Sequence, residues 1–512
     1  MNSCSIDGCE IESFSSQSNC ILHCEKTSPT SNDANAEFQN QLINHIIHEY
    51  HNSSEATKDI DNLTLYLKKG IELNSNNIKI LQEIVVYFFK IIFPIDYNSD
   101  INPINSIVRN IKAVHFDNCT FNHKGIASKK TQKAFYQQCS FHDEWTINND
   151  EILDDLKDNS IYQNCTFFKT VTNKNIDKIK CTFNSPIFRD CTFKEGIRLQ
   201  QAEFKEKIFN NDDLYIQNTN KIHIEDCIIS KRFVLNNSKF NTFSINNTSF
   251  KEKLEFRENQ VTDSMSLNSI KIDDILDFHN CKISSFLIRR ARFKGYVGFE
   301  SFTFGNINSP KADNAVTFTY ATFEDILNFR GTTFNDGLNI AMINSKMTPN
   351  FHGINVDYKN SNRETFRIIK NSLDSVGNHL EANNFYAYEM RKHHDEIKQT
   401  GSKQERFIYF INHTLSNFGQ SYLKPIMWLT ITSILLFAIT WLKEINLLYS
   451  IYTPANQYIT AIIGFINGVA LNIVPFKKFM IEGMEFLSLF FYIINISLIW
   501  LTITAIKRRT KR

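Results

Sequence analysis

The residues with the clearest metal-binding chemistry lie near the amino terminus, in the stretch CSIDGCEIESFSSQSNCILHC. This stretch supplies Cys4, Cys9, Cys20, His23 and Cys24. Two close pairs of thiol and imidazole groups on either side of a short loop are typical of a tetrahedral structural zinc site. Because so short a segment cannot bury a hydrophobic core, the metal would have to supply its folding free energy. We therefore predict a zinc knuckle over residues 1–26.

The choice of ligands stays open at one position. Zinc takes four ligands and the stretch offers five, so the prediction is Cys4, Cys9 and Cys20 with either His23 or Cys24. The alternative is an N-terminal tail with incidental thiols, because the C-x4-C spacing is longer than the common C-x2-C. Four protein ligands leave no open coordination position, which indicates a structural rather than a catalytic metal.

Other chemistry has little support in the sequence. There is no Gly-rich phosphate loop and no GxSxG or HExxH motif, and we expect no enzyme activity. The net charge is +2 over 512 residues, so we expect no nucleic-acid partner. The start MNSCSIDGCE lacks the basic flank and apolar core of a secretory signal. We therefore expect the large N-terminal part, with its cysteines reduced, in the cytoplasm.

The middle of the chain has a five-residue period. Phe occurs 44 times, and large apolar residues recur at steps of five, as in Leu235, Phe240, Ile245 and Phe250. This period fits neither an α-helix nor a β-strand, but it fits a square coil with five residues on each side. Each side would point one large and one small residue inward, and each Phe would lie over a Phe of the next coil. The small residues are Cys119, Cys139, Cys165, Cys181, Cys191, Ala202, Cys281, Ala291 and Ala321.

This pattern of a small residue, a polar residue and then Leu or Phe resembles the pentapeptide-repeat family. The resemblance implies a mainly β fold, a right-handed quadrilateral β-helix, over residues 110–358. We expect the interruptions at 142–160 and 305–315 to be loops. The repeated Cys is interpreted as a small, weakly polar core residue, since the same slot accepts Ala. The alternative, a ladder of metal-binding or redox cysteines, lacks a partner His or CxxC motif.

The segments before the repeats differ in pattern. Residues 27–35 are predicted to be a linker, and residues 36–109 a helical N-terminal cap region. The cap region ends in the apolar run IVVYFFKIIF at 84–93, which predicts a buried helix or a strand capping the first coil.

The segment after the repeats, residues 359–420, is predicted to be a helical linker. Ser361 and Glu364 suggest a capping box. The amphipathic aromatic stretch at 406–418 is expected to reach a membrane surface. A single helical seam is predicted from the apolar steps Phe366, Ile369, Leu373, Val376 and Leu380.

Residues 421–512 form a predicted membrane domain. Two uncharged apolar runs at 425–442 and 486–506 are long enough to span a bilayer, and the second is followed by KRRTKR. A third apolar run at 457–476 is broken by Gly, Asn and Pro. Two spans place KRRTKR in the cytoplasm, as the positive-inside rule prefers, so 457–476 is expected to be re-entrant or interfacial. Asn495 is expected to bond a neighbouring helix, or alternatively to line a pore.

The layout of the chain resembles bacterial pentapeptide-repeat membrane proteins, with repeats before a helical linker and C-terminal membrane helices. We therefore predict a multi-pass protein of the inner, cytoplasmic membrane, with its N-terminal part and C-terminus in the cytoplasm. It would function as a scaffold for protein binding or sensing. Its partners would be the bilayer and a protein that the sequence does not identify. The alternative is an ion-channel-like pore gated by the repeat domain, which would require a homo-oligomer because two spans cannot enclose water.

Overall fold

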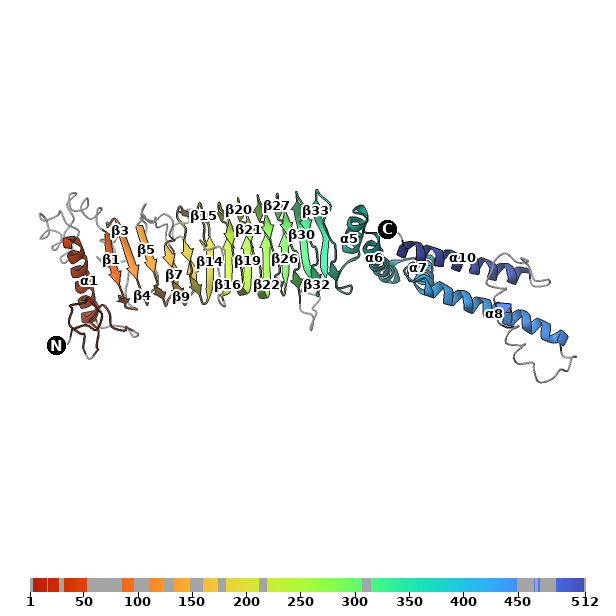
Figure 1. Cartoon of the computed structure of the whole chain (residues 1–512), viewed down its shortest axis with the longest axis horizontal. Helices are drawn as coiled ribbons and strands as arrows, with labels where there is room; N and C mark the ends of the chain where they lie inside the picture. The colour runs from red at the N-terminus through yellow and green to blue at the C-terminus, as the bar shows by residue number, and fades with distance from the viewer. Residues whose placement is uncertain are drawn as a thin grey trace. The chain divides into compact units, whose positions relative to one another are not determined.

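The protein forms two compact units, Met1–Asn360 and Ser361–Arg512 (Figure 1). Each unit is described by itself. The computed structural model describes residues 3–15, 17–26, 32–52, 85–95, 111–123, 133–147, 160–173, 181–210, 219–305, 315–448, 465, 468–469 and 485–510.

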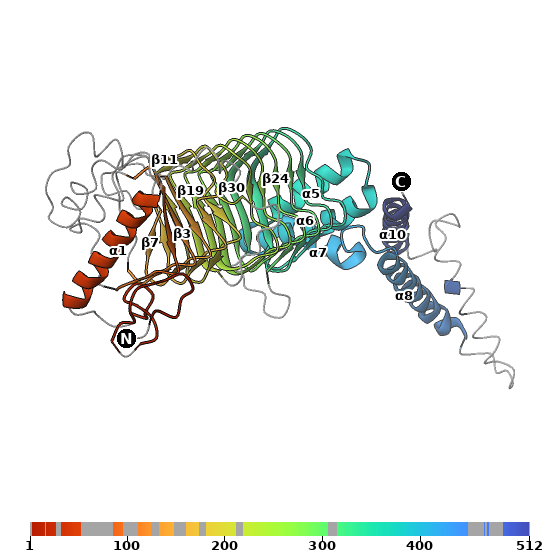
Figure 2. The same cartoon turned by 60° about the vertical axis from the view of Figure 1, so that its left-hand side comes forward.

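The first unit is a parallel β-solenoid, which confirms the predicted mainly β fold. Each strand pairs in parallel with the equivalent strand of the next turn (Figures 1 and 2). One sheet is β1 (Val85–Phe89), β3 (Ala113–Asp117), β5 (Lys133–Gln137), β8 (Tyr162–Gln163) and β12 (Phe188–Arg189). A second is β2 (Ile92–Phe93), β4 (Thr120–Phe121), β6 (Ser140–Phe141), β9 (Thr166–Phe167) and β13 (Thr192–Phe193). A third is β18 (Phe233–Val234), β21 (Leu254–Glu255), β24 (Leu276–Asp277), β28 (Val297–Gly298) and β31 (Leu327–Asn328).

Further parallel pairings join the remaining strands. These are β7 (Trp145–Thr146), β10 (Val171–Thr172), β11 (Cys181–Phe183), β14 (Gly196–Gln200), β15 (Ala202–Phe204), β16 (Thr219–Glu225), β17 (Ile228–Ile229), β19 (Lys239–Asn246), β20 (Ser249–Phe250), β22 (Gln260–Asn268), β23 (Lys271–Ile272), β25 (Lys282–Ile283), β26 (Phe286–Arg289), β27 (Arg292–Phe293), β29 (Thr303–Phe304), β30 (Val316–Phe323), β32 (Thr333–Phe334), β33 (Leu338–Ser345) and β34 (Asn355–Val356).

The aromatic residues of successive turns stack, as the five-residue period predicted. Phe93 and Phe121 lie 4.7 Å apart between ring centroids, with 6° between the ring planes. The column continues through Phe141 at 4.9 Å, Phe167 at 4.6 Å and Phe193 at 5.2 Å. Parallel offset stacking at this spacing adds favourable aromatic contact to the area buried by each ring. These columns form the core of the solenoid.

The chain turns from one strand to the next through residues in the left-handed conformation. Asn118, Gln138 and Asn164 each have a φ of 53° and each directly precedes a buried Cys. Asn and Asp tolerate this region better than other residues with a side chain. The same conformation recurs at Asp190, Gln201, Asp226, Asn237, Asn247, Glu258, Ser269, Asn280, Arg290, Ser301 and Tyr320.

Where it is Cys or Ser, the small residue after a corner also donates hydrogen bonds to backbone carbonyls. The Cys139 thiol donates to the carbonyl of Gln137 at 3.2 Å and to that of Phe116, in the preceding turn, at 3.4 Å. Ser238 occupies an equivalent slot, and its hydroxyl donates to the Asn236 carbonyl at 2.8 Å. The core interpretation of the repeated Cys is therefore confirmed at Cys119, Cys139, Cys165, Cys191 and Cys281, whereas Cys181 is half-buried. The slot also supplies a hydrogen-bond donor to backbone carbonyls.

The solenoid begins before the predicted boundary at residue 110. Within the run at 84–93, Val85–Phe89 form β1 and Ile92–Phe93 form β2, which pair with β3 and β4. FFKIIF at 88–93 matches FDNCTF at 116–121, with Lys90 at the left-handed corner and Ile91 in the small slot. The predicted 36–109 cap region is therefore helical only in part. Its helix, α1 (Asn32–Asn52), also starts inside the predicted 27–35 linker.

The predicted loops at the two interruptions fall largely outside the described residues. Within the first, however, Trp145 and Thr146 form β7, which pairs with β10. The prediction of a loop over all of 142–160 is therefore wrong at these positions, where Trp145 is buried against Phe141 with ring centroids 4.3 Å apart.

The second unit contains five described helices. These are α5 (Arg363–Ser375), α6 (His379–Thr400), α7 (Lys403–Ser416), α8 (Leu423–Leu448) and α10 (Glu485–Thr510). Helices α8 and α10 are long and apolar enough to cross a membrane, over Leu423–Trp441 and Leu487–Thr510. The segment predicted to be re-entrant lies mostly outside the described residues. Its Phe465 contacts Phe437 of α8, with ring centroids 5.2 Å apart.

Two predictions for the helical linker are wrong. The segment predicted to form one continuous helical seam forms two helices, α5 and α6. The chain breaks between them because Gly377 adopts a φ of 82° and Asn378 caps the start of α6. Val376 and Leu380, assigned to the seam, are exposed instead. The cap of α5 is not Ser361 but Asn362, whose side-chain oxygen accepts from the Thr365 N–H at 2.8 Å.

The corner geometry predicts that Arg290→Asn stabilises the solenoid. Arg290 has a φ of 52°, whereas its exposed neighbour Arg289 lies in β26 without this strain. We expect Arg290→Asn to raise the free energy of unfolding by about 0.5–1 kcal/mol and Arg289→Asn to leave it unchanged or lower it. Urea unfolding of the full chain in detergent measures both. An equal effect of the two substitutions would contradict the prediction.

Candidate metal centre

A small hairpin positions Cys4 and Cys9. Ser3 and Glu12 form an antiparallel bridge, and the Cys4 N–H donates to the Ile11 carbonyl at 3.0 Å. Gly8, with a φ of 81°, makes the turn that brings Cys9 back toward Cys4. A residue with a side chain would be strained at this position.

A single helical turn positions the other ligands. The N–H groups of His23 and Cys24 both donate to the Cys20 carbonyl, at 3.0 and 2.9 Å. Side chains three residues apart then lie on the same side of the turn, and this brings Cys20 and His23 together. The Cys24 thiol instead donates to the Ile21 carbonyl at 3.6 Å.

The four side chains meet in a cluster that could hold a metal ion. The ligand atoms of Cys4, Cys9, Cys20 and His23 all lie within 4.8 Å of one another. Cys9 Sγ is 3.7 Å from Cys20 Sγ, and His23 Nδ1 is 3.5 Å from Cys4 Sγ and 3.2 Å from Cys20 Sγ. Zinc–ligand bond lengths imply tetrahedral edges of about 3.8 Å between sulfurs and about 3.6 Å between sulfur and nitrogen. The cluster therefore has nearly the dimensions of a tetrahedral site.

Burial makes ionisation of the thiols costly. Burial raises the pKa of Cys20 to about 12, and burial also raises the pKa of Cys9. Burial opposes ionisation of Cys4 as well, but a hydrogen bond from the Cys20 N–H helps to lower its pKa overall. Three thiolates this close would also repel one another, so a bound cation would have to offset both this repulsion and the cost of burial.

The His23 ring is held in the tautomer that a metal needs. Its Nε2 lies 3.2 Å from the Phe89 carbonyl, which can only accept, so Nε2 carries the proton. The unprotonated Nδ1 then faces the three sulfurs. A ligating imidazole commonly donates its other N–H to a backbone carbonyl in this way.

The cluster of Cys4, Cys9, Cys20 and His23 is part of a cap on the first turn of the solenoid. The Ile92 N–H of β2 donates to the Leu22 carbonyl at 2.9 Å, where a preceding strand would otherwise pair. The buried Lys26 amine donates to the Ile92 carbonyl at 2.8 Å and to the Cys24 carbonyl at 3.0 Å. Burial lowers the pKa of Lys26 to about 8.

Helix α1 completes this cap and lies across the β1 end of the stack (Figure 2). His45 Nε2 lies 2.8 Å from the Tyr87 carbonyl and donates to it. Phe38 packs edge-on against Phe93, with ring centroids 5.8 Å apart. A cleft of about 460 Å³ separates the hairpin from α1, and Cys9, His23 and His45 are among its lining residues.

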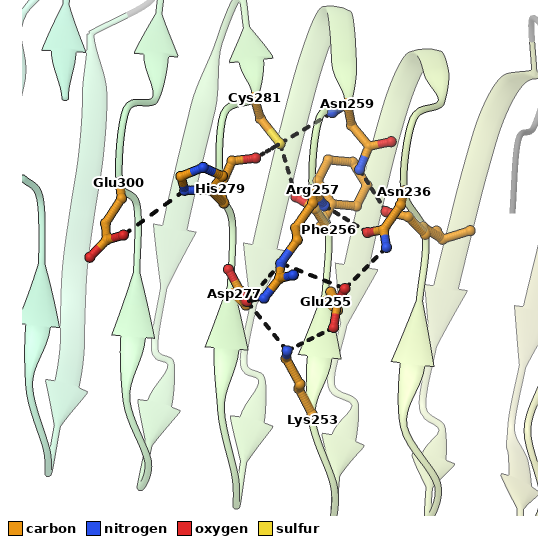
Figure 3. A network of polar contacts seen from close by, with 11 residues as sticks. Asn236, Lys253, Glu255, Phe256, Arg257, Asn259, Asp277, His279, Cys281 and Glu300 are labelled. Atoms are coloured by element: carbon orange, nitrogen blue, oxygen red, sulfur yellow. Dashed lines mark hydrogen bonds and ion pairs between the residues drawn. The ribbon is translucent and has the colours of Figure 1, made fainter. Parts of the chain in front are cut away.

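The other notable polar cluster is a ladder of ion pairs on the outer face of the solenoid (Figure 3). Lys253 lies 2.7 Å from Glu255 and 3.3 Å from Asp277, and Arg257 Nε lies 2.9 Å from Asp277. Burial opposes ionisation of Glu255, but hydrogen bonds from Lys253 and Asn236 help to lower its pKa. The cations and carboxylates pair with one another across turns, which indicates a structural role.

Comparisons with protein-family models, with curated proteins and with solved structures found no match for this chain. The pentapeptide-repeat resemblance is therefore supported only by the sequence period and the solenoid fold.

Of the five predicted metal ligands, the structure brings four together and turns Cys24 away. The sequence left His23 and Cys24 as alternatives, and the backbone turn at Cys20 decides between them. Sequence reasoning missed Lys26 and His45, which bond the first turn of the solenoid. No motif signalled either residue, because their partners are backbone carbonyls far along the chain.

The geometry predicts which cysteine controls metal binding. Cys20→Ser removes a ligand at the centre of the cluster, so the purified full chain should hold well under one metal ion. Cys24→Ser is the matched control, because it changes a buried thiol that donates to the Ile21 carbonyl and lies outside the cluster. We expect both the control and the unaltered protein to hold about one ion per chain.

Metal analysis by mass spectrometry measures all three proteins. Loss of the metal in Cys24→Ser with retention in Cys20→Ser would contradict the assignment, as would an unaltered protein with no metal.

Proposed function

We propose that the protein is a membrane-anchored, non-catalytic scaffold of the pentapeptide-repeat type, with a structural zinc ion at Cys4, Cys9, Cys20 and His23. A right-handed quadrilateral coil remains part of this proposal. Zinc is the metal that best suits three thiolates and one imidazole in a closed tetrahedral site.

The observation that carries the membrane proposal is the antiparallel pairing of α8 and α10. Thr432 of α8 donates to Asn495 of α10 at 2.8 Å, and both partners lie well inside the apolar segments. Arg508, near the end of α10, donates to the Phe418 carbonyl at 2.7 Å, five residues before α8 begins. The start of α8 and the end of α10 therefore lie at the same end of the pair.

This arrangement supports two crossings rather than three. A third span between α8 and α10 would make these helices parallel and would separate Phe418 from Arg508. With two crossings, Lys424 and the basic residues Lys507, Arg508 and Arg509 lie on one side of the bilayer. The positive-inside rule makes that side the cytoplasm, where the solenoid would also lie.

The scaffold proposal is supported by exposed apolar side chains on the late turns of the solenoid. Tyr320 is 64% exposed and Met342, which lies in the paired strand β33, is 54% exposed. Aromatic and Met side chains at the surface are typical of protein-binding patches. Binding of a protein partner is the proposed function of these faces, while the metal would stabilise only the cap.

Topology mapping tests the anchor. The full chain, expressed in a bacterium with a protease-cleavable tag at each end, should resist extraction from membranes by carbonate. Both tags should be protected in spheroplasts and cleaved in inverted vesicles. Cleavage of the C-terminal tag alone in spheroplasts would indicate an odd number of spans, and extraction by carbonate would exclude an integral anchor.

Asn495 is the side chain within the two spans that the pore alternative could place along a pore. In the structure this side chain is 3% exposed and accepts a hydrogen bond from Thr432, which favours the helix-pairing role. The double-mutant cycle of Asn495→Ala and Thr432→Ala should give a coupling free energy of about 0.5–1.5 kcal/mol in detergent unfolding. Absence of coupling, together with an altered ion flux in liposomes for Asn495→Ala, would favour the pore.

A further inference from the structure

Among the described residues, helix α7 packs against the rest of its unit along one side. Tyr409 contacts the ring of His393 at 4.9 Å between centroids, His413 stacks on His394 at 5.7 Å, and Ser416 is buried. At 100° per residue, positions 409, 413 and 416 fall on the same side of a helix. This side holds α7 against α6.

The opposite side of α7 is apolar and exposed. Phe407 is 64% exposed, Phe410 59%, Ile408 57% and Ile411 36%. The capping box of Ser402 and Glu405 fixes the start of this helix. Four large apolar side chains facing water on one short helix carry a free-energy cost in proportion to their area, which a contacting apolar phase would remove.

The position of α7 in its unit indicates that this apolar phase is a lipid bilayer. Its carboxyl end leads directly into α8 through Asn417, Phe418 and Gly419, all in the left-handed conformation. Arg508 of α10 donates to the Phe418 carbonyl and stacks over Tyr386, with 4.7 Å from the guanidinium to the ring centroid. The end of α7 is therefore fixed beside the ends of both apolar helices.

Basic side chains lie near the start of α8 and the end of α10, beside the end of α7. Lys424 lies at the start of α8, and Lys507, Arg508 and Arg509 lie in the last turn of α10. Lys403 and Arg406 add exposed positive charge on α7 itself. Basic residues at the ends of spans lie at the level of lipid headgroups and attract anionic lipids.

We propose that α7 is an interfacial helix that lies in the headgroup layer of the leaflet where α8 begins and α10 ends. Phe407, Ile408, Phe410 and Ile411 insert among the acyl chains, and Lys403 contacts anionic headgroups. The proposal rests on the proposed membrane anchor. It adds a second membrane-binding surface that fixes the direction in which the chain enters the bilayer.

Environment-sensitive fluorophores on single introduced cysteines test this surface in the full chain. The protein is reconstituted in vesicles of neutral and anionic phosphatidyl lipids, with and without lipids that carry a quencher at a known depth. The probe goes on Phe410→Cys, with exposed Asn412→Cys as the matched control two residues away and facing the other way. Leu435→Cys, exposed in the middle of α8, reports insertion of the span. The unaltered chain gives the background from native cysteines.

We expect blue-shifted emission and strong shallow quenching at position 410, several-fold weaker quenching at 412, and deep quenching at 435. Deep quenching at 435 with a water-like signal at 410 would overturn the interfacial helix and leave the anchor intact. A blue shift at 410 without lipid quenching would assign the face to a protein contact and also overturn the proposal. No quenching at 435 would overturn the anchor, and the interfacial helix with it.

Discussion

The free edge of the first solenoid turn is the constraint on which the rest of the structure depends. Strands inside the stack, such as β3 and β4, pair with a strand of the turn on each side, but β1 and β2 pair with no preceding strand among the described residues. The chain supplies substitutes for that missing turn. The imidazoles of His23 and His45 and the amine of Lys26 donate to edge carbonyls, and the Leu22 carbonyl accepts from β2. With this edge closed, the aromatic columns can extend from turn to turn.

The candidate metal cluster and the cap share one side chain, His23. The His23 ring presents Nδ1 to three sulfurs and Nε2 to the Phe89 carbonyl, so each contact orients the ring for the other. The hairpin and helical turn that carry the ligands have few apolar residues, and a metal would supply the free energy that a larger core supplies elsewhere. In the proposed function, the zinc ion therefore acts on the scaffold through the order of its first turn.

The sequence predicted the aromatic stacking, the small slot and five candidate ligands that include the four residues of the cluster, because these depend on side-chain type and spacing. It did not predict the start of the solenoid. In the first turn Lys90 stands at the corner, where Asn, Asp or Gln is common, and Ile91 stands in the slot of the small residue. The backbone nevertheless makes the same turn, and β1 pairs with β3. The cap contacts join residues 66 apart, from His23 to Phe89 and from Lys26 to Ile92, and no local pattern encodes such a pairing. The break between α5 and α6 was signalled by Gly377 and Asn378, but the apolar steps continue across it.

The central claim, that a bound metal holds the cap on the first turn, is tested most directly by amide hydrogen exchange of the full chain before and after chelation. The account predicts faster exchange in α1, β1 and β2 once the metal is removed, with unchanged protection in the later strands β22 to β30. Unchanged exchange in β1 and β2 after complete removal of the metal would contradict it.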